Sequence, residues 1–192
     1  MTQQGKIFFI SGPSGVGKGT LISELQKKYP EFVFPPSCTT RSPRPGEKEG
    51  ETYFFISLEE FKQKIKEGAF LEYACVHSQN FYGTLKEALL RPLKEGKIVI
   101  REFDVQGFEQ ARKTLPKESF TSIFLKPAEK VESLIERIRA RAPISDDEIK
   151  KRVLSMKKEL KKAGIYDHII ISKFGEINRL VSETEAIIFG KD

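Results

Sequence analysis

The sequence contains no tryptophan, only two cysteines among 192 residues, and no long apolar run. Cys38 and Cys75 form neither a CxxC pair nor a metal-ligand cluster, so we expect two reduced thiols that serve as small packing residues. No stretch approaches the roughly 18 consecutive apolar residues of a membrane span. The chain starts with the mostly polar segment Met-Thr-Gln-Gln-Gly-Lys where a signal peptide would have its apolar region. These absences predict a soluble, cytoplasmic protein without a membrane partner.

Length and charge narrow the class of protein further. A chain of 192 residues is long enough for one compact domain with a small inserted lobe, and it can bury a core without disulfides. The 33 lysines and arginines exceed the 27 acidic residues and give a formal net charge of +6. This charge is compatible with an anionic partner but identifies none, since nucleotides and nucleic acids both qualify.

Short apolar runs alternate with amphipathic segments along the chain. Strands are predicted at residues 6–11, 52–56, 70–76, 97–103, 119–125 and 168–171. Helices are predicted at 20–28, 57–66, 84–94, 129–141, 146–162 and 176–189, and a polar, proline-rich loop at 35–50. This alternation of strands and helices predicts an α/β fold with a doubly wound parallel sheet.

A glycine-rich segment between the first predicted strand and helix fits the pattern GxxxxGK. It consists of Gly12, Pro13, Ser14, Gly15, Val16, Gly17, Lys18, Gly19 and Thr20. In such a loop the backbone N–H groups surround phosphates, the lysine reaches the β and γ oxygens, and the helix N-terminus favours the anion. Because Gly19 replaces the usual serine or threonine, the hydroxyl for Mg²⁺ is expected from Thr20, or water replaces it.

A second charged motif lies in the proline-rich loop. Arg41 and Arg44 stand three residues apart, with prolines beside them. Two such arginines can hold one phosphate through forked, charge-assisted hydrogen bonds, and a tyrosine hydroxyl can add a third contact. The alternative for this motif alone is a solvated basic turn.

The loop from Thr39 to Tyr53 resembles the TTRxxRxGExxGxxY signature of the guanylate kinase family. With the phosphate loop, Glu72, residues 82–84 and residues 104–107, the resemblance covers nearly the whole chain. It implies a P-loop kinase fold with a core at about 1–35, 89–135 and 153–192, a small inserted GMP-binding lobe at about 36–88, and a helical lid at about 136–152. It also implies a monomeric or homodimeric enzyme, without a nucleic-acid partner, that transfers a phosphoryl group from ATP to GMP with Mg²⁺.

The same resemblance implies roles for individual residues. The GMP phosphate would be held by Arg41, Arg44, Tyr53 and Tyr82, and the guanine would be contacted by Ser37, Glu72, Thr84 and Asp104. The catalytic residues near the ATP phosphates would be Lys18, Arg137, Arg141 and Arg152, with Glu102 near the metal. A carboxylate such as that of Glu72 can accept from both N1–H and the 2-amino group of guanine, a pair of donors that adenine lacks.

The sequence departs from the family pattern at three places. Arg101 stands where an apolar residue is expected, and Ala142 and Pro143 follow Arg141 where the family usually has glycine and threonine. Ser172 and Lys173 replace an Asn-Asp pair near the adenine. The hinge of the lid and the preferred donor base therefore stay open.

Three alternative functions remain at this point. They are a guanylate-kinase-like interaction module that has lost catalysis, a nucleic-acid-binding protein, and a kinase with another acceptor. The intact lysine and arginines disfavour the first, and the lack of a stacking motif disfavours the second. A phosphate acceptor has a second pKa of about 6 and is largely deprotonated at neutral pH, so no general base is expected.

Overall fold

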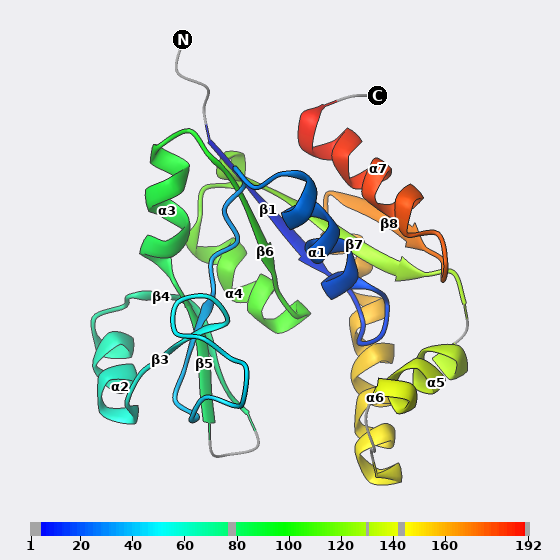
Figure 1. The fold of residues 1–192 in the computed structure, drawn as a ribbon, viewed down its shortest axis with the longest axis horizontal. Coiled ribbons are helices and arrows are strands. Elements are labelled where there is room, and N and C mark those ends of the chain that lie inside the picture. The colour runs from blue at the N-terminus through cyan, green and yellow to red at the C-terminus, as the bar shows by residue number, and fades with distance from the viewer. Residues whose placement is uncertain (1–4, 77–79, 130, 142–144, 191–192) are drawn as a thin grey trace. The chain divides into compact units, whose positions relative to one another are not determined.

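The computed structural model describes residues 5–76, 80–129, 131–141 and 145–190, without the side chains of Val76, Arg137, Ala140 and Arg141. Figure 1 shows the order of the elements. The strands are β1 (Lys6–Ser11), β2 (Ser37–Thr39), β3 (Tyr53–Phe55), β4 (Phe70–Val76), β5 (Asn80–Leu85), β6 (Ile98–Glu102), β7 (Phe120–Pro127) and β8 (His168–Ser172). The helices are α1 (Lys18–Lys28), α2 (Leu58–Lys66), α3 (Lys86–Lys94), α4 (Val105–Thr114), α5 (Val131–Arg141), α6 (Asp146–Lys161) and α7 (Ile177–Phe189), with 3₁₀ turns η1 (Lys117–Ser119) and η2 (Ala163–Ile165).

In the part of the chain that the structure describes, the strands form two four-stranded sheets. One sheet has the order β6-β1-β7-β8, and the other has the order β3-β2-β5-β4. The chain divides into two compact units, of which the first comprises Met1–Ile7, Glu31–Arg101 and Gln106–Phe120. The second comprises Phe8–Pro30, Glu102–Val105 and Thr121–Asp192. The predicted alternation of strands and helices is thus confirmed.

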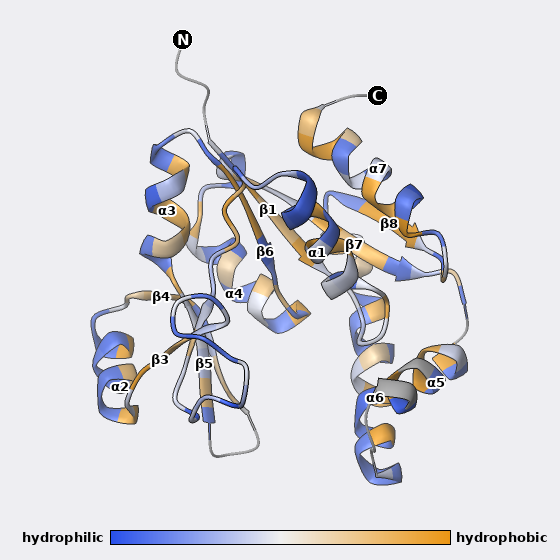
Figure 2. Cartoon of the chain, viewed as in Figure 1, coloured by the Kyte–Doolittle hydropathy of each residue, from blue (hydrophilic) through white to orange (hydrophobic). Residues whose placement is uncertain are grey.

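Buried apolar strands form the centre of the larger sheet. Residues 7–11 of β1 and 120–125 of β7 are buried, and Figure 2 shows hydrophobic residues along most of both strands. β7 and β8 run parallel, with Leu125 opposite Ile170. Parallel strands covered on both faces read as continuous apolar runs, which is why these segments were recognisable in the sequence.

The smaller sheet lies entirely in the first unit. β2 pairs with β3 in parallel and with β5 antiparallel, and β5 also pairs antiparallel with β4. Its core contains Cys38, Phe61 and Phe70, and the rings of Phe61 and Phe70 stack with centroids 4.3 Å apart. Gly83 permits close packing here, because a Cβ at this position would lie 2.9 Å from the ring of Phe70.

Several predicted boundaries were wrong in this smaller sheet. β2 lies inside the predicted loop at 35–50, and β5 includes residues 84 and 85, where a helix was predicted to begin. β2 has only three residues, so its strand conformation depends on pairing with β3 and β5 rather than on its own sequence pattern.

The helix α4 was also missed by the sequence-based prediction. Its second and third residues, Gln106 and Gly107, give no apolar start signal.

The cysteines meet the expectation only in part. Both are free, and Cys38 is buried in the core of the smaller sheet, where burial raises the pKa of its thiol to about 11. Cys75 is exposed, so the prediction that it is a packing residue was wrong. It lies on the edge strand β4 two residues after the exposed Tyr73, and alternate residues of a strand share a face.

Candidate active site

The phosphate loop connects β1 to α1. Gly12, Gly15 and Gly17 have φ angles of 147°, 82° and 105°, a region of backbone conformation that favours glycine. At Gly12 a side chain is also excluded sterically, since its Cβ would lie 2.5 Å from the carbonyl oxygen of Leu125. Gly17 is the N-cap of α1, so the free N–H groups of the first helical turn point toward the loop. The loop therefore has the geometry of an anion-binding turn.

Lys18 is folded over this loop. Its Nζ donates to the carbonyl oxygens of Gly12 at 2.6 Å and Pro13 at 3.2 Å, and it lies 3.7 Å from Oε1 of Glu102. The Lys18 side chain is 13% exposed, whereas the Glu102 side chain is 42% exposed. The predicted lysine and the predicted metal-proximal carboxylate are thus brought together, with the lysine charge at the mouth of the loop. Thr20 is exposed on the first turn of α1.

A cavity of about 140 Å³ lies beside the loop. Its lining includes Gly15, Gly17 and Thr20 from the loop and Ser172 and Lys173 from the end of β8. The Ser172 hydroxyl donates to the carbonyl oxygen of Val16 at 2.7 Å, which ties the loop to the larger sheet. The structure therefore places the divergent Ser-Lys pair next to the phosphate loop.

Arg41 is the centre of a cluster on the smaller sheet. Its Nε donates to the Tyr82 hydroxyl at 3.1 Å, and its guanidinium carbon lies 5.0 Å from the centroid of the Tyr53 ring. The rings of Tyr53 and Tyr82 are 5.9 Å apart at an interplanar angle of 66°. Strand register explains this proximity, because β2 pairs with both strands that carry the tyrosines. Three of the four residues predicted to hold a phosphate are thus gathered, and the fourth, Arg44, is exposed on the same loop.

Glu47 organises this loop, a role that the sequence alone did not reveal. Its two carboxylate oxygens accept from Nη1 and Nη2 of Arg41, each at 2.6 Å, and Oε2 also accepts from the backbone N–H of Arg44 at 2.8 Å. The hydrogen bonds from Arg41, followed by that from Arg44, lower the pKa of Glu47 from 4.5 to about 2. The same contact with Glu47 raises the pKa of Arg41. In the sequence, the only indication of this role was that Glu47 occupies the glutamate position of the TTRxxRxGExxGxxY signature.

Three of the four residues predicted to contact guanine form one network. Glu72 on β4 lies opposite Thr84 on β5, and the Thr84 hydroxyl donates to Oε1 of Glu72 at 2.6 Å. Nη2 of Arg101, on β6, donates to Oγ1 of Thr84 at 2.8 Å and to the hydroxyl oxygen of Ser37. Thr84 is fully buried. The fourth residue, Asp104, belongs to the second unit, where it is exposed between β6 and α4.

Glu159 on α6 is a further acidic residue near the phosphate loop. Burial raises the pKa of its carboxyl, whereas a hydrogen bond from Ser155 and the charge of Lys18 lower it, and the charge of Asp104 raises it. Glu159 therefore lies within electrostatic reach of the loop lysine. No sequence pattern indicates this position, because a glutamate on a charged helix usually belongs to a solvated face.

The predicted lid falls on α5 and α6. Arg152 is partly exposed on α6, and its Nε lies 3.2 Å from Oε1 of Glu148 one turn earlier. Arg137 and Arg141 belong to α5, but their side chains lie outside the described residues, as do Ala142 and Pro143. α5 and α6 pack through Leu134, Ile138 and Met156, which are buried.

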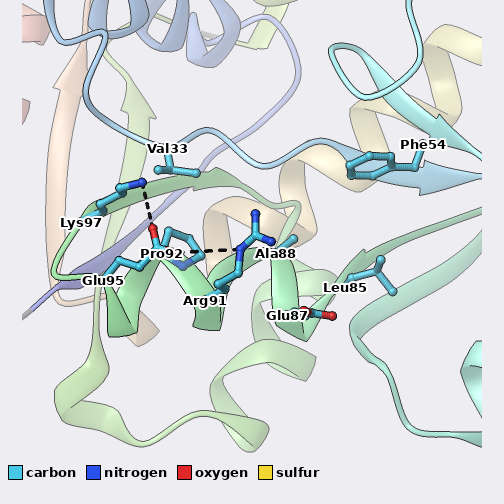
Figure 3. A pocket seen from close by; sticks show the side chains of 9 residues that line it. All are labelled: Val33, Phe54, Leu85, Glu87, Ala88, Arg91, Pro92, Glu95 and Lys97. Atoms are coloured by element: carbon cyan, nitrogen blue, oxygen red, sulfur yellow. Dashed lines mark ion pairs between the residues drawn. The ribbon is translucent and has the colours of Figure 1, made fainter.

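A second cavity, of about 320 Å³, lies against α3 and is distinct from the predicted site (Figure 3). Its lining includes Val33 and Pro92, with Arg91, Glu95 and Lys97 among its charged residues. Glu95 pairs with Lys97 at 2.8 Å and with Arg91 at 4.0 Å, so these charges partly satisfy one another. None of the predicted site residues lines this cavity.

Comparison with known proteins agrees with this geometry. A sequence model described as guanylate kinase matches residues 4–188. The guanylate kinase of Caldanaerobacter subterraneus subsp. tengcongensis is 41% identical over 189 residues, covering 98% of this chain and 89% of that protein. The guanylate kinase of Helicobacter pylori strain 26695 is 44% identical over 167 residues, covering 87% of this chain and 79% of that protein. The crystal structure of guanylate kinase from Anaplasma phagocytophilum aligns with a TM-score of 0.71 at 27% identity, covering 98% of this chain and 87% of that one.

The phosphate loop between β1 and α1 of an α/β fold, with its lysine at the mouth, defines the chain as a P-loop kinase. The predicted fold class is therefore confirmed. Within that class, the matches over nearly the full length show that the chain belongs to the guanylate kinase family.

Proposed function

We propose that this chain transfers the γ-phosphoryl group of ATP to the phosphate of GMP, giving ADP and GDP. Family membership supports the reaction. The observation that carries the proposal is that the smaller sheet brings together an arginine and two tyrosines around Arg41, and a hydrogen-bonded carboxylate around Glu72, on neighbouring strands; the first cluster would suit a phosphate and the second a base. A mononucleotide has one phosphate and one base, so this pairing suits a mononucleotide acceptor.

On the acceptor side, Arg41, Arg44, Tyr53 and Tyr82 would hold the GMP phosphate. The planar guanidinium of Arg41 is held by the carboxylate of Glu47, the Tyr82 hydroxyl and the carbonyl oxygen of Ser42, so it would reach the phosphate through its remaining Nη2 hydrogen and its charge. Ser37, Glu72, Thr84 and Asp104 would contact the guanine. Glu72 would accept from N1–H and the 2-amino group, whereas AMP would present a bare N1 acceptor to the carboxylate.

On the donor side, the segment from Gly12 to Thr20 would hold the phosphates of ATP, and Lys18 would neutralise charge on the group in transfer. Arg137, Arg141 and Arg152 would add positive charge when the lid closes over the phosphates. The acceptor oxygen is already deprotonated near neutral pH, so alignment and charge neutralisation suffice and no general base acts. The cavity beside Ser172 and Lys173 would admit the donor base, and the open question of base preference lies with these two residues.

The oxygen donors near the loop suit Mg²⁺, a hard cation that often takes one or two carboxylates and completes its shell with phosphate oxygens and water. Thr20 and Glu102 would hold it, through water, and it would supply charge neutralisation between the ATP phosphates. Among the described residues, no group of three or more His, Cys, Asp or Glu side chains could hold a metal. The ion would therefore depend on ATP for most of its ligands.

The predicted organisation is part of the same proposal. Residues 36–88 would act as the GMP-binding lobe, residues 136–152 as the lid and the remainder as the core, in a monomer or homodimer. No helix among the described residues has the length and apolar character that a membrane span requires. We place the reaction in the cytoplasm, where its nucleotide substrates occur, and we expect no nucleic-acid partner.

ADP release from ATP, measured against GMP, dGMP, IMP, AMP, CMP and UMP, tests the proposal. We expect fast release with GMP and slow release with AMP, CMP and UMP. Fast release with another monophosphate instead of GMP would identify a kinase of a different acceptor. GMP binding by calorimetry without ADP release would indicate a module that has lost catalysis, and salt-sensitive binding to a polynucleotide would indicate a nucleic-acid-binding protein.

A further inference from the structure

Arg101 occupies an unexpected place on β6. The strand reads Ile-Val-Ile before it, and Val99 and Ile100 are buried, so an apolar residue would continue the pattern. Instead, the guanidinium donates hydrogen bonds to a backbone carbonyl and to two hydroxyls within the first unit. Nη1 donates to the carbonyl oxygen of Pro35 at 2.7 Å, and Nη2 donates to the hydroxyl oxygens of Ser37 and Thr84. Arg101 therefore joins β6 to two strands of the smaller sheet.

These contacts determine the direction of the neighbouring hydrogen bonds. An arginine side chain donates only and stays charged, whereas a hydroxyl has one hydrogen and can also accept. Thr84 accepts from Arg101 and so donates its hydrogen to Glu72. Ser37 also accepts from Arg101, which leaves its hydrogen to be donated elsewhere. An apolar residue at position 101 would impose neither direction.

We propose that Arg101 is a positioning residue for base selection, acting through the hydroxyls of Ser37 and Thr84. At position 6, guanine and hypoxanthine carry an oxygen acceptor, whereas adenine carries an amino donor. A Ser37 hydroxyl that must donate its hydrogen forms a hydrogen bond with O6 of guanine or hypoxanthine. It cannot do so with the 6-amino group of adenine, because both groups are then donors. This inference rests on the proposed guanine site, to which it adds selection at position 6. Glu72 would read N1 and the 2-amino group, and Arg101 would orient the Ser37 hydroxyl that reads O6 and the Thr84 hydroxyl that donates to Glu72.

The test is a steady-state comparison of kcat and KM for GMP, IMP and AMP at saturating ATP. The variants are Arg101→Met and, as a matched control, Arg91→Met, which removes the same charge from the exposed face of α3 in the same unit. For Arg101→Met we expect KM for GMP and for IMP to rise by the same factor, roughly 10- to 100-fold. AMP should change by less than about threefold, kcat should change little, and Arg91→Met should match wild type.

A double-mutant cycle with Ser37→Ala identifies the pathway of the effect. If Arg101 acts through the Ser37 hydroxyl, then Arg101→Met should lower kcat/KM for GMP by a smaller factor in the Ser37→Ala background than in wild type. Arg101→Lys keeps the charge but not the forked guanidinium. Its ratio of kcat/KM for GMP to kcat/KM for AMP should therefore lie between those of Arg101→Met and wild type. If Arg101→Met does not fold, Arg101→Gln is measured in the same way. Its ratio of kcat/KM for GMP to kcat/KM for AMP is expected to fall as predicted for Arg101→Met.

The outcomes separate this inference from the proposed function. A GMP to AMP ratio that stays within twofold of wild type in a folded Arg101 variant, with only the melting temperature lowered, overturns the inference and leaves Arg101 as a structural residue. Additive effects in the cycle with Ser37 overturn the proposed pathway. If wild type itself shows no preference for GMP over AMP, then the proposed function fails, whatever the Arg101 variants do.

Discussion

The phosphate loop differs in its construction from the network of Ser37, Glu72, Thr84 and Arg101 that we propose contacts the base. The loop consists of nine consecutive residues whose glycine conformations and backbone groups suit an anion, and its lysine is held by carbonyl oxygens of the same loop. The network consists of side chains from β2, β4, β5 and β6, joined by directed hydrogen bonds. A charge can be stabilised by a local turn, but a base edge must be read by groups of the right polarity on several strands. Damage to the loop should therefore stop catalysis, whereas damage to the network should change selection.

The largest effect is expected from Lys18→Met. The substitution removes the charge at the mouth of the loop, and we expect kcat to fall by about 10³-fold or more, because interactions with a transferring phosphoryl group act mainly in the transition state. Lys27→Met, on the exposed end of the same helix, should stay close to wild type. Turnover by Lys18→Met within tenfold of wild type, with circular dichroism unchanged, would contradict the proposed role.

A smaller, substrate-specific effect is expected from Arg41→Ala. The substitution removes the centre of the phosphate grip and leaves Glu47 without its bidentate partner, so we expect kcat/KM for GMP to fall by about 100-fold. KM for ATP should change by less than about threefold. Arg41→Lys should restore part of the loss, since it keeps the charge but not the fork. An equal loss of ATP and GMP affinity would show that the loop supports both sites.

The smallest effect is expected from Glu47→Gln, and it should depend on pH. The folded pKa of Glu47, about 2, lies below its ordinary value of 4.5, so the ionised carboxylate stabilises the fold above pH 4.5. That contribution is lost as the pH falls from about 4.5 to about 2. The melting temperature of Glu47→Gln should be a few degrees below that of wild type at pH 7, and the two should converge near pH 2.

Glu51→Gln is the matched control for this measurement. Glu51 is exposed on the same loop and lies 3.4 Å from Lys48, also exposed. Exposed ion pairs of this kind contribute little to the stability of the fold. The melting curve of Glu51→Gln should therefore follow that of wild type at every pH. A constant difference between Glu47→Gln and wild type down to pH 2 would show that the carboxylate charge is not what stabilises the loop.

The two regions also differ in how far the sequence predicts them. The phosphate loop was recognisable because its conformation depends on residues 12–20 and on the adjacent strand and helix. The acceptor residues were named through a family signature, and only strand register explains why Arg41 meets Tyr53 and Tyr82. A prediction from local pattern cannot supply that register, since it depends on pairing between segments far apart in the chain.

The sequence-based prediction mainly missed the surroundings of charged residues that have partners in the folded chain. Arg101 looked like a departure from an apolar strand, and Glu159 looked like one charge on a solvated helix. Their surroundings come from tertiary contacts: Arg101 bonds to residues 64 and 17 positions away, and Glu159 is half-buried and within electrostatic reach of Lys18. Composition and spacing give the residue types but not these neighbours. Such residues can be identified only once the tertiary contacts of the chain are known.

The most direct test of guanine selection by Glu72 is the ratio of kcat/KM for GMP to that for AMP, measured in wild type and in Glu72→Gln at fixed salt. Sites that hydrogen-bond a substrate group can reject an analogue that lacks it by about 10⁴ to 10⁵ in kcat/KM, so we expect a strong preference for GMP in wild type, with IMP intermediate. Glu72→Gln keeps the size of the side chain but removes its charge and one acceptor, and the GMP to AMP ratio should shrink. An equal loss for GMP, IMP and AMP would contradict the account, because Glu72 would then support the fold without reading the base.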